Sequence, residues 1–278
     1  MVVFLATSFG LSTLLSLPLW FWGGMQNPYL ELIGFALMWS PAIAALLAVL
    51  IAGRPFRFAA NLGLWPVGNL RRFLFYLASA AVMMIAFSLL ALIIPAYLGL
   101  YPGDILSVQD LIAMQLVGVL VLTIINVLGA LGEEIGWRGW LLPRLMHLGT
   151  IKAILITGII WGLFHAPFVL LGQDYPGIPP WAGVLMKVGS CIVLGGILGW
   201  LRIRSGSVWP AAIGHSALNS AAGLGLVFLA VGGEVNAATS TTTGWAGWIA
   251  PAVVLVLLVA TQRFRPKATA SASLATSS

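Results

Sequence analysis

Two adjacent glutamates, Glu133 and Glu134, stand out in a chain of which 60% of the residues are hydrophobic and only 7% are charged. Arg138 follows Glu134 by four residues, so on a helix it can neutralise Glu134 across one turn. Glu133 is then left without a local counter-charge. A carboxylate in such apolar surroundings is suited to act as a general base. For Glu134 and Arg138, a purely structural clamp is the open alternative.

A histidine, His165, follows Trp161 by one helical turn in the next long apolar run. At this spacing the indole ring can wall a pocket and orient the imidazole. A lone histidine on an apolar face is more often a satisfied core residue, so His165 taken alone leaves both interpretations open.

A third pair, His215 and Asn219, lies four residues apart in a later apolar run and shares one helical face. Two hydrogen-bond donors that point to one place are what an oxyanion hole requires. The alternative is a polar pair that holds neighbouring helices together. Because the candidate residues come from three separate runs in a chain with few polar groups, the economical hypothesis is that they converge on one site.

The elements that position these residues are predicted to be membrane helices. Apolar runs of about 20 residues recur along the chain, and each can cross a hydrocarbon core roughly 30 Å thick. Backbone groups in lipid must pair within their own segment, so each run is a helix. We therefore expect an all-α, polytopic membrane helix bundle of about eight spans. These are Val2 to Trp22, Leu30 to Ala52, Phe73 to Tyr97, Leu111 to Leu131, Ile151 to Leu171, Trp181 to Trp200, Val208 to Leu229 and Trp245 to Thr261.

The basic residues orient this bundle, because Lys and Arg remain on the cytoplasmic side of a membrane. They fall in the second, fourth and sixth loops and in the tail: Arg54, Arg57, Arg71, Arg72, Arg138, Arg144, Lys152, Arg202, Arg204, Arg263, Arg265 and Lys267. Acidic residues lie mostly in or beside the other loops: Glu31, Asp104, Asp110, Asp174 and Glu234. Both termini are therefore predicted to be cytoplasmic. Glu133 is expected at the cytoplasmic end of the fourth span, and His165 deeper in the membrane than His215. Lys187 alone lies within a span and departs from the alternation.

A single transmembrane domain is predicted over residues 1–262, with its core motifs at 133–219, followed by a disordered cytoplasmic tail at 263–278. Val2 to Trp22 has no basic residue before it and no small-residue cleavage pattern after it, so we expect a retained span. The net charge of +6 is explained by the basic loops, and we expect no nucleic-acid partner. The one cysteine, Cys191, excludes an intrachain disulfide and a cysteine metal cluster.

In chain order, the motifs Glu-Glu-x-x-x-Arg, aromatic-x-x-x-His and His-x-x-x-Asn resemble those of the CAAX prenyl protease and bacteriocin-processing family. The resemblance covers Glu133 to Asn219 specifically, and more loosely the stretches Trp39 to Ala42 and Arg138 to Arg144. The family usually has phenylalanine where this chain has Trp161. We expect that difference to change the shape of the pocket more than its chemistry.

The resemblance implies an intramembrane endopeptidase in which Glu133 and His165 activate a water while His215 and Asn219 stabilise the oxyanion. Glu134 and Arg138 would brace the site. We expect no cofactor, because a metal would occupy Glu133 and leave only Glu134, already facing Arg138, as a base. Zinc bound by Glu133, His165 and His215 is the alternative that remains open.

The implied partners are membrane lipid and a peptide or lipidated protein, possibly prenylated, and the implied location is a bacterial inner membrane. Other protease chemistries fit less well. No His-Glu-x-x-His motif is present, and no histidine follows His215 to serve Ser216 as a base. A non-catalytic immunity or scaffold protein is the competing hypothesis, and a transporter with a polar site at mid-membrane is a weaker one.

Overall fold

The fold was analysed in a computed structural model that describes residues 1–53, 57–65, 67–98, 109–222, 224, 237–239 and 241–264. For residues 96 and 109–114 it describes the backbone alone. Over these residues all regular secondary structure is helical, which confirms the predicted all-α class. Arg54, Asp104, residues 225–229 of the seventh predicted span, Glu234 and residues 265–278 of the predicted tail lie outside the described residues.

Each of the eight predicted spans coincides with a helix. The helices are α1 (Val2–Phe21), α2 (Leu30–Ala52), α3 (Phe58–Asn61), α4 (Leu70–Tyr97), α5 (Gln109–Glu134), α6 (Leu142–Leu145), α7 (Thr150–Phe164), α8 (Ala166–Val169), α9 (Pro180–Ser205), α10 (Trp209–Ala221) and α12 (Ile249–Ala260). By length and hydropathy, 5 segments of the described chain can cross a membrane. Helices α7, α10 and α12 are shorter, with 15, 13 and 12 residues, so the count of eight spans stays a prediction.

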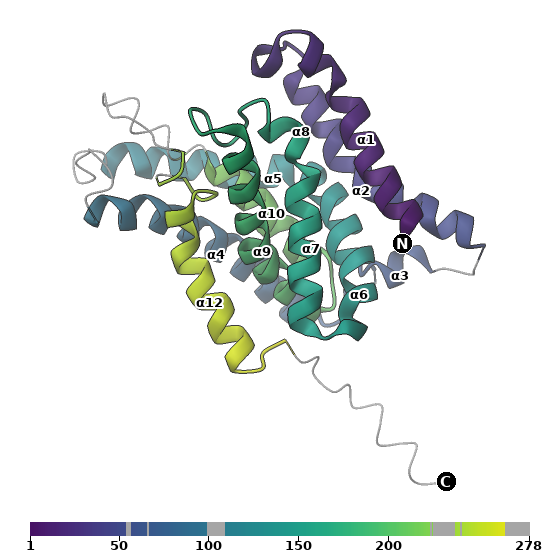
Figure 1. Cartoon of the computed structure of the whole chain (residues 1–278). Coiled ribbons are helices and arrows are strands. Elements are labelled where there is room, and N and C mark those ends of the chain that lie inside the picture. The colour runs from purple at the N-terminus through teal and green to yellow at the C-terminus, as the bar shows by residue number, and fades with distance from the viewer. Residues whose placement is uncertain are drawn as a thin grey trace.

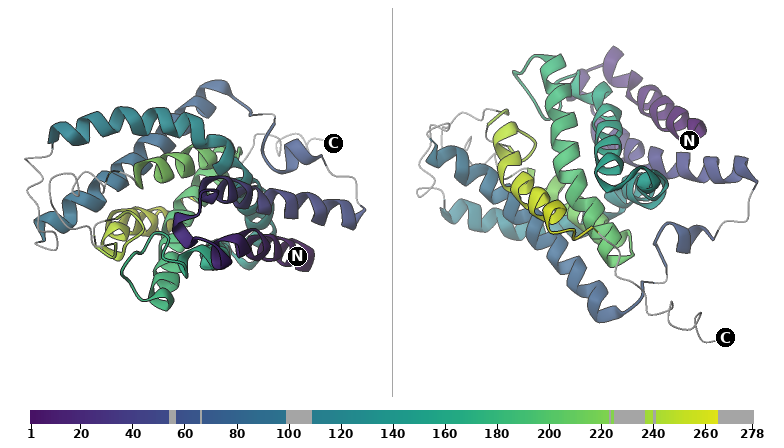
Figure 2. Two further views of the ribbon diagram at one scale, coloured as in Figure 1. Left: turned by 90° about the horizontal axis from the view of Figure 1, so that it is seen from above. Right: turned by 60° about the horizontal axis from the view of Figure 1, so that its bottom comes forward.

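The helices form two crossing groups around the centre of the molecule. Figure 2 shows α4, α5 and α10 running side by side across α7 and α9, while α1 and α2 pair at one end (Figures 1 and 2). Glycines allow α7 and α9 to approach closely. A Cβ atom on Gly158 or Gly162 would lie 2.5 Å from the Cα of Ile192 or Val188. Small residues permit this kind of contact between membrane helices.

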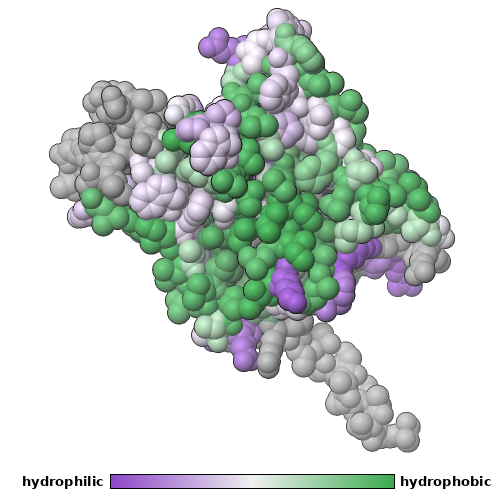
Figure 3. Space-filling view, in the orientation of Figure 1, coloured by the Kyte–Doolittle hydropathy of each residue, from purple (hydrophilic) through white to green (hydrophobic). Residues whose placement is uncertain are grey.

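The outer surface is apolar, as a lipid-facing surface must be. Large hydrophobic side chains on several helices, among them Leu50, Val82 and Val256, are exposed. Figure 3 shows a continuous hydrophobic face over α7, α9 and α12, with hydrophilic residues gathered below it. An exposed apolar surface of this extent would be unstable in water, so the chain is an integral membrane protein.

The helix that carries the two glutamates does not end where the sequence analysis placed its end. After α5, the chain continues as a π-helix over Ile135–Leu141, then as α6, and turns only after Leu148. The predicted end of the fourth span at Leu131 was therefore too early, because the apolar helical segment extends to Leu148. The polar residues Glu133, Glu134 and Arg138 lower the local hydropathy, but they lie inside the helical segment and are buried there.

The turn between α6 and α7 explains how His165 reaches the glutamates. Residues 135–148 run toward the turn and α7 runs back from it, so Glu133 and His165 each lie 16 residues from Gly149, or roughly 24 Å along a helix at 1.5 Å per residue. The π-helix packs closely on α2, because a Cβ atom on Gly136 would lie 2.3 Å from the Cβ of Pro41. π-Helical turns are rare and occur frequently at functional sites.

Candidate active site

Glu133 is buried at the junction of α5 and the π-helix, with 2% of its surface exposed. Its Oε2 atom accepts two hydrogen bonds, from the indole Nε1 of Trp161 at 2.6 Å and from that of Trp137 at 3.1 Å. The same oxygen lies 3.9 Å from His165 Nε2. Thus α5, the π-helix and α7 together fix one oxygen of this carboxylate.

His165 follows the last residue of α7, and the backbone fixes its ring. Its Nδ1 atom lies 2.8 Å from the carbonyl oxygen of Trp161, one turn earlier. Since a carbonyl can only accept, Nδ1 carries the proton and Nε2 of the neutral ring is an acceptor. The acceptor nitrogen is therefore the one that faces Glu133.

Glu134 has a different environment, although it is adjacent in sequence. Its Oε1 atom lies 2.7 Å from Arg138 Nη1 and 3.0 Å from His215 Nδ1, and both Glu134 and Arg138 are fully buried. The predicted Glu134–Arg138 pair is confirmed. Glu134 of this pair also contacts His215 from α10. The sequence analysis had assigned His215 to the oxyanion hole together with Asn219.

The guanidinium of Arg138 packs on the ring of Trp161 and against Gly195. It lies 4.1 Å from the centre of the Trp161 ring, and the edge of His215 packs on the same indole at a centroid distance of 5.2 Å. A Cβ atom on Gly195 of α9 would lie 2.7 Å from Arg138 Nη2, so the absent side chain makes room for the guanidinium. Trp161 thus contacts both glutamate clusters.

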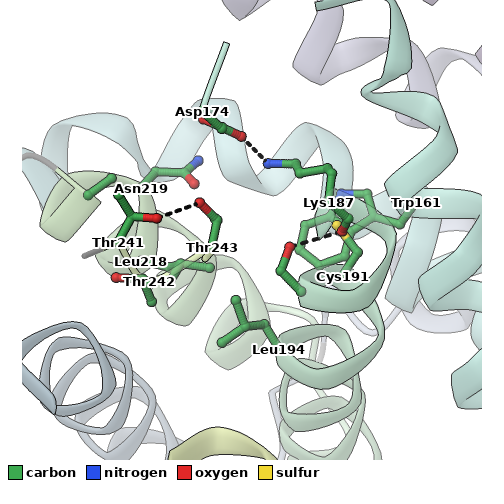
Figure 4. A pocket seen from close by; sticks show the side chains of 12 residues that line it. Trp161, Asp174, Lys187, Cys191, Leu194, Leu218, Asn219, Thr241, Thr242 and Thr243 are labelled. Carbon is green, nitrogen blue, oxygen red and sulfur yellow. Dashed lines mark hydrogen bonds and ion pairs between the residues drawn. The ribbon is translucent and has the colours of Figure 1, made fainter. Parts of the chain in front are cut away.

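Asn219 lies on the wall of a cavity beside these residues. The cavity has a volume of about 160 Å³ and is bordered by α7, α9, α10 and the segment that precedes α12 (Figure 4). Asn219 and Trp161 both line it, whereas no side-chain hydrogen bond or ion pair joins Asn219 to Glu133, His165 or His215 within the described chain. The structure therefore brings Glu133 and His165 into contact, joins His215 to Glu134 instead, and places Asn219 on the adjoining cavity wall.

A polar group that the sequence analysis did not assign borders the same cavity. Lys187 Nζ of α9 lies 2.6 Å from Asp174 Oδ2, on the loop after α8. On the same loop, Tyr175 donates a hydrogen bond to the carbonyl oxygen of Thr243 at 2.9 Å. Burial raises the pKa of Tyr175 to about 12, so its hydroxyl remains a donor over the whole physiological range. The departure of Lys187 from the charge alternation was the one signal in the sequence for this group.

Two further residues change the interpretation of the motifs. Trp137, which no motif included, donates to Glu133 from the next helical turn. Trp161 donates a hydrogen bond directly to the Glu133 carboxylate, a contact that the sequence analysis did not predict. The Ser216 hydroxyl donates to the carbonyl oxygen of Thr123 at 2.7 Å, as a packing residue does.

The arrangement does not fit the zinc set formed by Glu133, His165 and His215. Glu133 Oε2, the oxygen nearest His165, already accepts two N–H groups, and His215 Nδ1 faces Glu134. Among the residues that the structure describes, no three histidine, cysteine, aspartate or glutamate side chains are grouped so that they could hold a metal ion. The chemistry that this geometry supports directly is acid–base chemistry by a fixed carboxylate and a fixed imidazole.

Comparison with known proteins relates this geometry to a family. Residues 115–221 match the family model described as type II CAAX prenyl endopeptidase, Rce1-like. A curated protein of Methanococcus maripaludis, described as CAAX prenyl protease 2, is 30% identical over 98 residues. That similarity covers 33% of this chain and 36% of the relative, so the chain matches only about a third of the relative's length. The segment matched by the family model contains all four predicted site residues.

Proposed function

Because the chain belongs, through residues 115–221, to the Rce1-like family of CAAX prenyl endopeptidases, we propose that it hydrolyses peptide bonds within the membrane. The observation that carries this proposal is the contact between Glu133 and His165. Their Oε2 and Nε2 atoms, from two different helices, lie 3.9 Å apart in a buried setting beside a cavity. A base and a second hydrogen-bond acceptor placed together next to a space for substrate can orient and deprotonate a water molecule.

In the proposed mechanism, the Glu133 carboxylate removes a proton from a water molecule. The resulting hydroxide forms a C–O bond to the substrate carbonyl carbon, and the carbonyl oxygen becomes an oxyanion. Glu133 then gives the proton to the amide nitrogen as the C–N bond breaks, which leaves a carboxylic acid and an amine. His165 Nε2, an acceptor in the neutral ring, holds the water's other hydrogen and so orients the water.

The oxyanion requires donors, and we assign that role to His215 and Asn219. His215 Nδ1 faces Glu134, so Nε2 can donate only when both ring nitrogens carry a proton. The Glu134 carboxylate is the counter-charge for that form, and Arg138 holds Glu134 in place. Asn219 offers an amide N–H from the cavity wall. Removal of one such donor typically costs about 10²–10³-fold in kcat.

The substrate class that we propose is a membrane-associated peptide, possibly prenylated. The cavity is comparable to the roughly 150 Å³ of an engineered cavity that holds benzene, so it can take one side chain beside the scissile bond. A bacterial inner membrane is the proposed location. The test is incubation of purified protein in detergent with a quenched fluorescent peptide library that includes a farnesylated peptide. Cleavage of some of these peptides supports the proposal, whereas no cleavage by well-folded protein favours a scaffold or immunity protein.

We propose that the reaction needs no metal, so a chelator should leave the cleavage rate unchanged. The reason is that, among the described residues, Glu133, His165 and His215 are not grouped so that they could hold one metal ion together. The rate would be measured before and after dialysis against a chelator, with a zinc endopeptidase as the positive control. A rate that falls and returns on addition of zinc would contradict the metal-free mechanism.

Substrate in the cavity should protect Cys191 from thiol reagents. Cys191 is the single cysteine of the chain and lines the cavity. A bound peptide would therefore block the approach of a small maleimide. Labelling would be followed by mass spectrometry with and without a cleavable peptide, and Cys191→Ala would define the background. Equal labelling rates with and without peptide would show that the substrate binds elsewhere.

A further inference from the structure

The two carboxylate oxygens of Glu133 have unequal surroundings. Oε2 accepts the indole N–H groups of Trp161 and Trp137 at 2.6 and 3.1 Å. Oε1 accepts no hydrogen bond from any residue within the described ranges. A carboxylate oxygen offers about two lone-pair sites, so Oε2 is fully engaged, and Oε1 is the oxygen left to take a proton from water.

Both indoles are held by their own packing, so their donor directions are fixed. Trp137 packs edge-on against Phe4 and Phe164, with ring centroids 5.6 and 5.2 Å away. Trp161 contacts the Arg138 guanidinium, 4.1 Å from its ring centre, and the ring of His215, at a centroid distance of 5.2 Å. Side chains locked in this way can preorganise a functional group, because the group loses no further freedom when the reaction occurs.

We propose that Trp161 is a positioning residue of the protease, whose indole N–H holds Glu133 Oε2 so that Oε1 is the base. This inference rests on the proposed function. The shorter of the two indole bonds comes from Trp161, which also supplies the carbonyl that fixes His165. A single residue of α7 thus sets the orientation of both groups that act on the water.

A purely structural role makes a different prediction. A buried indole N–H needs an acceptor, and Glu133 could serve only to satisfy it. In that case loss of the N–H would change stability and leave the turnover of the folded protein unchanged. The positioning role predicts a fall in kcat with little change in KM, because the geometry of water activation is affected while the binding of the peptide is not.

The test is replacement of Trp161 in the full chain by benzothienylalanine, which keeps the bicyclic shape and has sulfur in place of N–H. We expect kcat to fall about 10–100-fold, the range for a misplaced catalytic group, while KM stays within about twofold. Trp161→Phe should lower kcat as well. The matched control is benzothienylalanine at Trp200, whose buried indole nitrogen has no partner within the described residues and lies outside the site. This control should leave both constants unchanged.

A second readout needs no cleavage. The 15N–1H indole resonance of Trp161 should shift when Glu133→Ala removes its acceptor, and that of Trp200 should not. An unchanged kcat in the folded benzothienylalanine variant, or an unshifted Trp161 resonance, would overturn the positioning role alone. A wild-type protein that cleaves no peptide would overturn the proposed function, and this inference with it.

Discussion

Glu133→Gln is expected to lower kcat by about 10²–10⁴-fold, the usual contribution of a general base. The change keeps the size of the side chain and retains an oxygen that can accept the indole N–H groups of Trp137 and Trp161, but it removes the basic carboxylate. The fold should therefore survive while water activation is lost. Initial rates on a quenched fluorescent peptide would give kcat and KM for both proteins.

Glu31→Gln is the matched control, because Glu31 is an exposed acid in the first turn of α2. It should behave as wild type. Thermal unfolding in detergent should show similar midpoints for all three proteins. A Glu133→Gln protein that retains most of its turnover would contradict the role of Glu133 as the base. One that no longer inserts or folds would point instead to a structural carboxylate, as expected for a scaffold.

Arg138→Met should have the largest effect on stability, roughly 3–5 kcal/mol, the cost of breaking a buried ion pair by removing one partner. Arg138 and Glu134 are fully buried, so the carboxylate would be left without its counter-charge. Removal of both charges in Arg138→Met/Glu134→Gln should recover much of this loss, because no uncompensated charge remains. Unfolding midpoints in detergent would show whether the double variant lies closer to wild type.

Lys152→Met is the control for loss of a basic residue, since Lys152 is exposed at the start of α7. It should change the midpoint little. The double variant should stay inactive even where it is stable, because His215 loses the carboxylate that faces its Nδ1 atom. If Arg138→Met unfolds at the wild-type midpoint, the pair does not hold the fold, and its role is restricted to the site.

The sequence predicted the helical class and the partners that lie one turn apart on one helix. Glu134 and Arg138 are the clearest case, because a four-residue spacing determines which side chains meet. It also predicted that separate spans converge, which the contacts of Glu133 with His165 and of Glu134 with His215 confirm. Asn219 was assigned to the same point, but the structure places it on the neighbouring cavity wall.

Other features depend on how helices and loops pack against one another, which the spacing of residues in the sequence does not determine. The π-helix over Ile135–Leu141 has no local sequence signal. The span was predicted to end too early because its polar residues lower the hydropathy, and their burial and pairing depend on the tertiary structure. The indole of Trp161 reaches across to another helix, so its bond to Glu133 follows from tertiary packing. Likewise, Lys187 finds Asp174 on a loop rather than at helical spacing.

The hairpin formed by α6, the turn at Gly149 and α7 has a consequence for substrates. Glu133 and His165 lie roughly 24 Å along a helix from that turn, and an extended chain advances about 3.3–3.6 Å per residue. Under the proposed function, and with the turn at a membrane face, a substrate that enters from that face would have to offer about seven unfolded residues before its scissile bond. A folded domain closer to the scissile bond than this distance would stop at the lipid headgroups before the bond reached the site. Under the proposed function, the depth of the site would therefore favour flexible tails over compact proteins as substrates.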